Sequence, residues 1–300
     1  MMMRVLMVGV GDIARKAYLP VLAARGDIEL HVATRDPAVR DQVVREHRLP
    51  HHHASLDAAL AATRFDAAFV HAATPAHPDL VATLLDRGVA TFVDKPLADT
   101  LAAAEVLVEQ ARRRGTPLVL GFNRRFAPDY VALRGRGTLI TLEKHRHRQP
   151  DEARRVVFDD FIHVVDTLLF LAPGAVRRHA IETQVADGRL HAVTLTLAGD
   201  GFGAIGLMHR DSGLDEERLD VIGGGERHSV LDLAERIDTA GTQQRRRRGD
   251  WTAVARQRGF EAMCDDFLTA ARERRPVDAD AILRTHALCE EIVRHAEAAG

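Results

Sequence analysis

The feature that most constrains the fold is a short apolar run that leads directly into a glycine turn. Residues 4–8, RVLMV, are followed by Gly9, Gly11 and Ala14 in the pattern G-x-G-x-x-A, and an amphipathic segment begins at once. A strand, a tight glycine turn and a helix start form the fingerprint of dinucleotide-binding βαβ units. The first glycine permits the turn, the second lets the backbone approach a pyrophosphate, and the small third residue lets the helix pack on the strand.

The first 121 residues continue as an alternation of two patterns. Short aliphatic or β-branched runs cover 4–9, 28–34, 67–73, 90–94 and 118–122, and runs of helical periodicity cover 12–24, 37–46, 78–87 and 99–113. This alternation predicts an α/β fold, the Rossmann doubly wound parallel sheet, whose ligands bind at the carboxyl ends of the strands. Asp12 and Ile13 join the predicted cofactor-binding residues because N–H groups at a helix start hold phosphates.

After residue 122 the pattern changes to consecutive strand-like stretches. They cover 138–148, 179–186, 189–198, 202–209, 217–223 and 227–232, with helical patterns at 159–171, 252–274 and 278–297. Strands without intervening helices predict an α+β domain with a large, open, mainly antiparallel sheet. We therefore divide the chain into a dinucleotide-binding domain, 1–121, and a substrate-binding and oligomerisation domain, 122–300. The C-terminal helix is a candidate to pack back on the first domain, and the large sheet predicts a homodimer or higher homo-oligomer.

Composition excludes several classes of partner. The 300 residues carry a formal net charge of −2, so the chain lacks the global basic field that holds a nucleic-acid backbone. No run reaches the roughly 18 apolar residues of a membrane span. The two cysteines, Cys264 and Cys289, have no metal-type spacing and are predicted to be core residues of a cytoplasmic protein in a reducing compartment. A small-molecule substrate is the expected partner.

Two conspicuous runs are interpreted as surface features. His51, His52 and His53 could hold a metal, but neighbouring side chains of an extended segment point to opposite faces and no carboxylate lies at ligand spacing. A short surface strand with no metal is therefore predicted. The arginine run at 245–248 is isolated in an otherwise balanced chain, which favours a solvated loop over a phosphate or nucleic-acid site.

The end of the second predicted strand bears on cofactor choice. A carboxylate that binds the adenosine ribose 2'-hydroxyl is expected there for NAD, but the chain has Thr34 followed by Arg35. A neutral hydroxyl does not repel a 2'-phosphate, and a guanidinium can pair with one. NADP(H) is therefore favoured over NAD(H). The alternative is that Asp36 reaches the ribose from a shifted turn.

Three further motifs resemble those of the Gfo/Idh/MocA oxidoreductases, and the resemblance extends over nearly the whole chain. They are Thr74-Pro75 with His77, Asp94-Lys95-Pro96, and DDFIHVVD at 159–166. GFNRRFAP at 121–128, EKHR at 143–146 and MHR at 208–210 are most similar to the MviM-like branch. The chain departs from the family pattern at Asp94, where glutamate is usual, and at Phe161, where glycine is frequent and a ring is expected to narrow the substrate pocket.

The resemblance implies a dehydrogenase or reductase that moves a hydride between a nicotinamide and a small polar substrate, such as a sugar, a cyclitol or a related oxo compound. It implies that the cofactor is contacted by Ala73, Thr74, Pro75, His77, Asp94 and Lys95. It implies that the substrate is contacted by Tyr18, Asn123, Arg124, Lys144, Arg146, Asp160 and His209.

The catalytic residues predicted for this reaction are Lys95, His163 and Asp159. Oxidation of an alcohol needs a base for the hydroxyl proton and a cation for the developing alkoxide, and His163 and Lys95 can supply them. Asp159 and His163 are spaced i,i+4, so a helix beginning near 159 would place both on one face, where the carboxylate can fix the imidazole tautomer. The alternative is that Asp159 or Asp160 caps that helix.

The charge of the substrate and the class of reaction stay open at this point. Lys144 and Arg146 share a strand face, and with Arg124 and Arg210 they favour an anionic substrate if that face lines the pocket. If Asp and Glu residues pair with these cations instead, a neutral sugar or cyclitol is the better expectation. Two other classes are an NAD-dependent glycosidase that oxidises its substrate transiently and a non-catalytic nucleotide-sensing protein.

Overall fold

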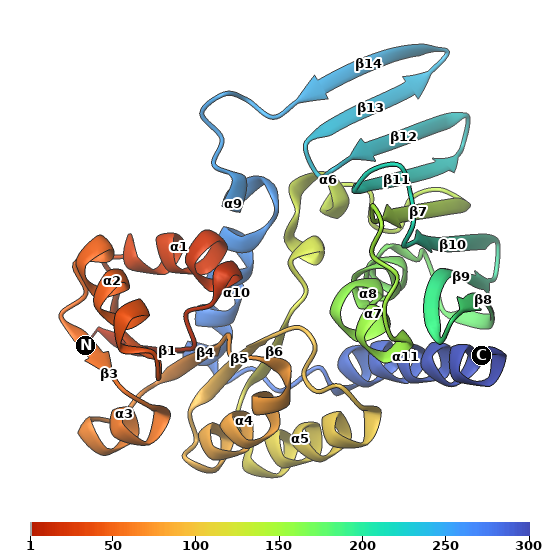
Figure 1. Cartoon of the computed structure of the whole chain (residues 1–300). Coiled ribbons are helices and arrows are strands. Elements are labelled where there is room, and N and C mark those ends of the chain that lie inside the picture. Colours follow the sequence, from red (N-terminus) through yellow and green to blue (C-terminus); the bar gives the residue numbers. More distant parts are fainter. Residues whose placement is uncertain (1) are drawn as a thin grey trace. The chain divides into compact units, whose positions relative to one another are not determined.

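The computed structural model describes residues 2–300 and divides into two compact units (Figure 1). The first unit comprises the chain up to Gly121 together with Phe260–Leu283, and the second comprises Phe122–Gly259 and Arg284–Gly300. The sequence analysis had placed residues 260–283 in the second domain. The structure packs them with the first unit because Phe267 lies against Phe69 and Phe92, with ring centroids 4.8 and 5.5 Å apart.

The first unit is built on a six-stranded, wholly parallel sheet with the order β3-β2-β1-β4-β5-β6. Its strands are β1 (Met3–Val8), β2 (Ile28–Ala33), β3 (His51–His53), β4 (Ala67–Val70), β5 (Ala90–Asp94) and β6 (Leu118–Gly121). The order reverses between β1 and β4, which is the position where doubly wound sheets bind their ligands. The predicted Rossmann sheet is confirmed, and the histidine run forms the short edge strand that was expected.

Helices connect these strands, and the last two helices of the chain also belong to this unit, wholly or in part. They are η1 (Ala14–Tyr18), α1 (Leu19–Ala23), α2 (Pro37–His47), α3 (Leu56–Ala62), η2 (Thr74–Ala76), α4 (His77–Asp86), α5 (Leu101–Arg114), α10 (Phe260–Glu273) and α11 (Ala279–Ala299), the last of which continues into the second unit. Side chains of Asp36, Ser55 and Thr100 cap α2, α3 and α5 by accepting backbone N–H groups. The α5 helix ends at Gly115, which adopts the left-handed conformation.

The second unit is built on an eight-stranded sheet with the order β14-β13-β12-β11-β7-β10-β9-β8. Neighbours are antiparallel except for the parallel pair β7 and β10, so the predicted mainly antiparallel sheet is confirmed. The strands are β7 (Leu139–His145), β8 (Val176–Ala186), β9 (Arg189–Gly199), β10 (Phe202–His209), β11 (Glu216–Gly223), β12 (Glu226–Leu231), β13 (Glu235–Ala240) and β14 (Thr242–Arg247).

The helices of the second unit differ from the prediction in two places. They are η3 (Asn123–Phe126), α6 (Pro128–Val131), α7 (Ala153–Val156), η4 (Val157–Phe161), α8 (Ile162–Leu171) and α9 (Val254–Gln257). The helix expected from 159 begins at Ala153 and passes through the π-helical turn η4. The helix expected over 252–274 is broken at Gly259, whose φ is +83° and where a side chain would overlap the backbone of Asn123 and Ala127.

The arginine run also differs from the prediction, because most of it lies in the edge strand β14 rather than in a loop. Each residue of this strand is exposed, and the side chains of Arg245 and Arg247 pair with Glu235 at 3.4 and 3.3 Å. Charged side chains on an edge strand discourage pairing with another chain. The run is solvated as expected, but it pairs with β13 because the preceding Gly241 forms a tight turn with a φ of +71°.

Both cysteines are buried and free, as expected for core residues. In the part of the chain that the structure describes, no helix has the length and the apolar composition needed to cross a bilayer.

The packing of α8 on the large sheet generates a stability prediction. A Cβ added at Gly206 on β10 would lie 2.5 Å from Val164 Cγ1 and 2.9 Å from Leu168 Cδ1, whereas one added at Gly203 on the same strand would meet nothing within 4 Å. We expect Gly206→Ala to destabilise the protein by about 1–3 kcal/mol through overpacking.

Gly203→Ala is the matched control, and we expect it to leave the midpoint of thermal unfolding nearly unchanged. Equal midpoints for the two variants would contradict the packing described for α8 on β10.

Candidate functional site

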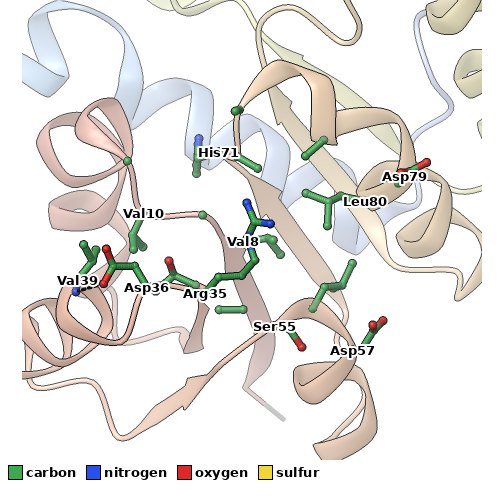
Figure 2. Close-up of a pocket in the computed structure, with 18 of the residues that line it drawn as sticks. Val8, Val10, Arg35, Asp36, Val39, Ser55, Asp57, His71, Asp79 and Leu80 are labelled. Carbon is green, nitrogen blue, oxygen red and sulfur yellow. Dashed lines mark hydrogen bonds between the residues drawn. The ribbon is translucent and has the colours of Figure 1, made fainter.

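A cavity of about 620 Å³ opens in the first unit at the carboxyl ends of β1, β2 and β4 (Figure 2). Its lining comprises Val8, Gly9, Val10, Gly11, Ala33, Thr34, Arg35, Asp36, Val39, Ser55, Leu56, Asp57, His71, Ala72, Ala73, Ala76, Asp79, Leu80 and Thr83. The cavity therefore lies where open α/β sheets bind ligands.

The glycine turn forms one wall of this cavity. Gly9 has a φ of +86°, and a Cβ there would lie 2.7 Å from the Ala72 nitrogen and 2.8 Å from the His71 carbonyl oxygen. Both facts restrict this position to glycine. A Cβ at Gly11 would meet no protein atom within 4 Å, so the fold itself does not require glycine there. A backbone that only a ligand could crowd fits the pyrophosphate of a dinucleotide.

The helix start beside the glycine turn is partly buried and partly exposed. Ala14 is fully buried at the start of η1, as the fingerprint requires for close helix packing. Asp12 and Ile13 are exposed, and the Asp12 carboxylate lies 2.9 Å from Lys16 Nζ. Neither residue is part of the cavity lining, so their predicted cofactor contacts stay predictions.

After the end of β2, the cation Arg35 lines the cavity, whereas the neighbouring carboxylate of Asp36 caps a helix. The Thr34 N–H donates to the His53 carbonyl at 3.2 Å. Asp36 Oδ1 accepts the Ala38 and Val39 N–H groups at 2.9 and 3.2 Å, which caps α2. Figure 2 shows the Asp36 carboxylate turned toward Val39 and the Arg35 side chain extending toward the middle of the cavity. Arg35 forms no ion pair or hydrogen bond with any of residues 2–300.

Tyr18 and the partly exposed Asp94 form a pair at the ends of their elements. Tyr18 is fully buried and its hydroxyl donates to Asp94 Oδ1 at 3.5 Å, and the same oxygen accepts the Lys95 N–H at 2.9 Å. Burial, followed by the Asp94 charge, raises the pKa of Tyr18 well above its usual value. Tyr18 therefore stays protonated at neutral pH. Its hydroxyl contacts Asp94, and the substrate contact that the resemblance implied stays a prediction.

His71 is a cavity residue that the sequence analysis missed. It follows β4, its ring centroid lies 4.1 Å from that of Tyr18, and its nearest carboxylate oxygen is Asp94 Oδ2 at 3.9 Å. Both ring nitrogens are buried without a hydrogen-bond partner among residues 2–300. A buried polar group in this state requires a partner from a ligand or water. The signal in the sequence was a single polar residue inside an apolar strand end, AAFVHAA.

His77 joins two loops beside the cavity instead of lining it. Its Nδ1 lies 2.8 Å from the Pro96 carbonyl oxygen and its Nε2 lies 2.9 Å from the Ala72 carbonyl oxygen. Burial lowers the pKa of His77, and the Pro96 and Ala72 carbonyls act in the opposite direction. The loop after β4 is thereby tied to the loop that follows Lys95. Thr74, Pro75, Asp94 and Lys95 are also outside the cavity lining, whereas Ala73 is part of it.

In the second unit, the π-helical turn η4 carries Asp159 and Asp160. Because the helix already begins at Ala153, neither carboxylate is its N-cap, and the capping alternative is wrong. A π turn inside an α-helix is frequently found at a functional site. Asp159 is exposed, with Oδ2 3.9 Å from Arg155 Nε, and His163 lies half-buried in the first turn of α8. Asp159 and His163 are therefore separated by the junction between the π-helical turn η4 and the α-helix α8, and do not share one regular α-helix.

Asp160 is the centre of a network of buried charges. Its carboxylate accepts hydrogen bonds from Arg146 at 2.7 and 2.9 Å and from Arg210 at 2.7 Å, and it lies 3.0 Å from Lys144 Nζ. Burial opposes ionisation, but Lys144 and Arg146 outweigh it and lower the pKa of Asp160 to about 2. Burial and the Arg124 charge lower the pKa of Lys144 to about 8.

Glu217 holds Arg124, the last of the four cations that the sequence analysis had grouped as a possible cationic face of the substrate pocket. It accepts Arg124 Nε and the Tyr130 hydroxyl, each at 2.9 Å, and lies 3.7 Å from Lys144 Nζ. Despite its burial, the Arg124 guanidinium lowers the pKa of Glu217 to about 2. Asn123 is buried and donates to the Arg258 carbonyl at 2.9 Å. Arg124 and Asn123 are thus bonded within the unit.

The cationic face is therefore paired with carboxylates. Each of its four cations contacts Asp160 or Glu217, which is the alternative that the sequence analysis left open. A polar pocket of about 500 Å³ adjoins this network and is lined by Arg146, Gln149, Pro150, Asp151, Arg155, Val156, Asp159, Asp160 and Arg210. Lys144 and Arg124 do not line it, so the pairing weakens the case for an anionic substrate.

Two further residues that the sequence analysis singled out, His209 and Phe161, form contacts within the second unit. His209 Nδ1 accepts the Asp211 N–H at 3.1 Å, and its backbone N–H donates to His145 Nδ1 at 2.9 Å. Phe161 is fully buried, and a Cβ at Gly206 would lie 3.7 Å from its ring. The ring packs against β10, and the expectation that Phe161 narrows the substrate pocket stays a prediction.

Comparison with known proteins agrees with this geometry. Residues 3–122 match the oxidoreductase family with an NAD-binding Rossmann fold, Gfo/Idh/MocA, and residues 129–239 match the YceM-like C-terminal domain.

Three proteins illustrate the similarity. YceM of Salmonella typhimurium (strain LT2) is 34% identical over 296 residues, which cover 91% of this chain and 90% of that protein. The myo-inositol dehydrogenase Hyg17 of Streptomyces leeuwenhoekii is 34% identical over 289 residues, covering 90% and 85%. The crystal structure of a Gfo/Idh/MocA family oxidoreductase from Vibrio cholerae superposes with a TM-score of 0.93 at 30% identity over 99% of both chains. The chain is therefore an oxidoreductase of the Gfo/Idh/MocA family with a YceM-like C-terminal domain.

Proposed function

We propose that the protein is an NADP(H)-dependent dehydrogenase or reductase that acts on a neutral, polyhydroxylated substrate such as a cyclitol or sugar. The observation that carries the cofactor assignment is the state of Arg35. Its guanidinium has no carboxylate partner in residues 2–300, lines the cavity and follows a neutral Thr34. A cation in this position favours a phosphate on the adenosine ribose.

The neighbouring carboxylate supports the same assignment. NAD-specific sites use an Asp or Glu to bind the two ribose hydroxyls. Asp36 is the only acidic residue that the sequence offered for this task, and its Oδ1 already accepts two N–H groups of α2. Turning Asp36 toward a ribose would uncap that helix, at a cost of about 1 kcal/mol. NAD(H) is thus the less favoured cofactor.

The chain's own residues supply proton transfer and charge stabilisation. A nicotinamide dinucleotide held by Gly9, Gly11 and Arg35 would supply or accept the hydride. Lys95 carries the positive charge that stabilises the developing alkoxide, and the imidazole of His163 takes the hydroxyl proton, or returns it in the reductive direction. Asp159 orients His163. Tyr18 contributes indirectly, because its hydroxyl holds the Asp94 carboxylate to which the Lys95 N–H also donates.

The substrate assignment rests on the paired cations of the second unit. An anionic ligand would have to compete with Asp160 and Glu217, both of which stay ionised down to low pH because their pKa values lie at about 2. A neutral polyol can bind without displacing Asp160 or Glu217 from the cations, because its hydroxyl groups can form hydrogen bonds to the polar atoms of these ion pairs. The relative named as a myo-inositol dehydrogenase agrees with a cyclitol substrate. Assembly into a homo-oligomer through the eight-stranded sheet stays a prediction.

The first test concerns the cofactor. We expect NADPH to bind at least tenfold more tightly than NADH, because a charge-assisted hydrogen bond to the 2'-phosphate contributes about 1.5–3 kcal/mol. Arg35→Ala should remove most of this difference and leave NADH affinity unchanged, as measured by calorimetric titration. Tighter binding of NADH to the unmodified protein would overturn the assignment.

The second test concerns the reaction. We expect Lys95→Ala and His163→Ala each to lower kcat by at least a hundredfold, while NADPH affinity changes only a few-fold, because both groups act on the transition state. The assay follows the net change in reduced nicotinamide with cyclitols and sugars. A net change also distinguishes a dehydrogenase from a glycosidase that restores its cofactor.

Near-normal turnover by His163→Ala would show that another group handles the proton. Turnover restricted to phosphorylated or carboxylated substrates would contradict the neutral-substrate assignment.

A further inference from the structure

The register of the first sheet gathers three histidines and one carboxylate at its edge. Strand β3 pairs with β2 in parallel so that His51 lies opposite His31 and His53 lies opposite Ala33. Paired residues, and residues two apart on one strand, share a face of the sheet. Glu29, His31, His51 and His53 are therefore on one face, whereas His52 is on the other.

The contacts within this group are short and direct. Glu29 Oε1 lies 2.9 Å from His31 Nε2, and His31 Nδ1 lies 3.1 Å from His53 Nε2. The His31 and His53 rings are nearly parallel, at 2°, with centroids 5.4 Å apart, so they meet edge to edge. His51 stacks on His31 with centroids 4.3 Å apart. One ligand atom from each of Glu29, His31 and His51 lies within 4.8 Å of the others.

We propose that Glu29, His31 and His51 bind a divalent transition-metal ion of the Zn²⁺ class, with His53 as the residue that orients His31. Two imidazoles and one carboxylate are a ligand set that suits Zn²⁺, and water completes its coordination. Donor atoms around a tetrahedral Zn²⁺ lie about 3.4 Å apart. The donors that now lie up to 4.8 Å apart must therefore approach one another, whereas Glu29 Oε1 and His31 Nε2, at 2.9 Å, must separate slightly. His51 is exposed and can make that movement.

The contact between His31 and His53 provides the second shell that such a site needs. A metal-bound imidazole donates its other N–H to a fixed acceptor, which sets its tautomer and orientation. With the ion on Nε2 of His31, the proton lies on Nδ1 and is donated to His53 Nε2. If both rings are neutral, His31 moves its one proton from Nε2 to Nδ1 when the ion binds, and it releases no proton to solvent.

One neighbouring cation opposes the ion. Arg4 Nε lies 3.2 Å from Glu29 Oε1, the oxygen that also contacts His31. The Arg4 side chain is 44% exposed, so it can turn into solvent when Glu29 binds a metal. Phe65 covers the other side of the group, with its ring edge on His31 at a centroid distance of 5.0 Å. The group is thus covered by Phe65 on one side and exposed at His51.

The histidine run in the sequence had been interpreted as having no metal role because no carboxylate lay at ligand spacing. The carboxylate and the third imidazole come from β2, 20 or more residues earlier in the chain, and only the strand register brings them together. Strand β3, which carries His51, also accepts the Thr34 N–H through its His53 carbonyl. An ion at this edge would thus brace the strand that supports the loop bearing Arg35.

The test uses untagged, chelator-treated protein and Zn²⁺ in competition with a chromophoric chelator. We expect one tight site per chain, with affinity at least tenfold lower in His51→Ala and in Glu29→Gln. His52→Ala is the matched control, because it removes a neighbouring exposed histidine from the opposite face, and its affinity should stay within twofold of the unmodified protein. Circular dichroism checks that each variant is folded.

Two results would overturn the proposal. One is equal loss in His52→Ala and His51→Ala, which would show that the run chelates as an unstructured surface tag. The other is no site tighter than that of the His51→Ala variant. Zn²⁺ should also raise the thermal midpoint of the unmodified protein but not that of His51→Ala. None of these readouts depends on turnover, so the outcome is independent of the proposed function.

Discussion

The close approach of Gly9 to the loop after β4 is the constraint on which the cofactor site depends. Its N–H donates to the Ala33 carbonyl at 2.9 Å, and the His71 N–H donates to the Val8 carbonyl at 2.8 Å, so the ends of three strands meet at this turn. A side chain at Gly9 would collide with the backbone at residues 71 and 72. The position of the cavity, and the approach of Arg35 and His71 to it, follow from this contact.

A different constraint governs the second unit, where buried and partly buried cations are held by Asp160 and Glu217. Removing one partner of such a pair leaves an uncompensated charge, which is far more costly than exchanging the whole pair. Asp160 binds Lys144 of β7, Arg146 directly after β7 and Arg210 directly after β10, and it is itself held by a π-helical turn. The network therefore fixes the helix segment that carries Asp159 and leads into His163.

Local patterns in the sequence were sufficient for the Rossmann sheet, the glycine turn and the mainly antiparallel second sheet. They failed where partners are distant in the chain. The pairing of Lys144 with Asp160 and Glu217 joins three separate segments, and the approach of Glu29 to His31 and His51 depends on strand register. The turn at Gly259 and the π turn η4 were missed for a related reason, because each breaks a helical periodicity that the residues themselves would support.

The measurement that tests the account most directly is dinucleotide binding by a Gly11→Val variant. A Cβ at Gly11 meets no protein atom within 4 Å, so the fold should tolerate the substitution, whereas a bound pyrophosphate should not. We predict an unchanged midpoint of thermal unfolding and at least a hundredfold loss of NADPH affinity in calorimetric titration. Unchanged NADPH affinity in a folded Gly11→Val variant would contradict the claim that this glycine turn cradles the cofactor.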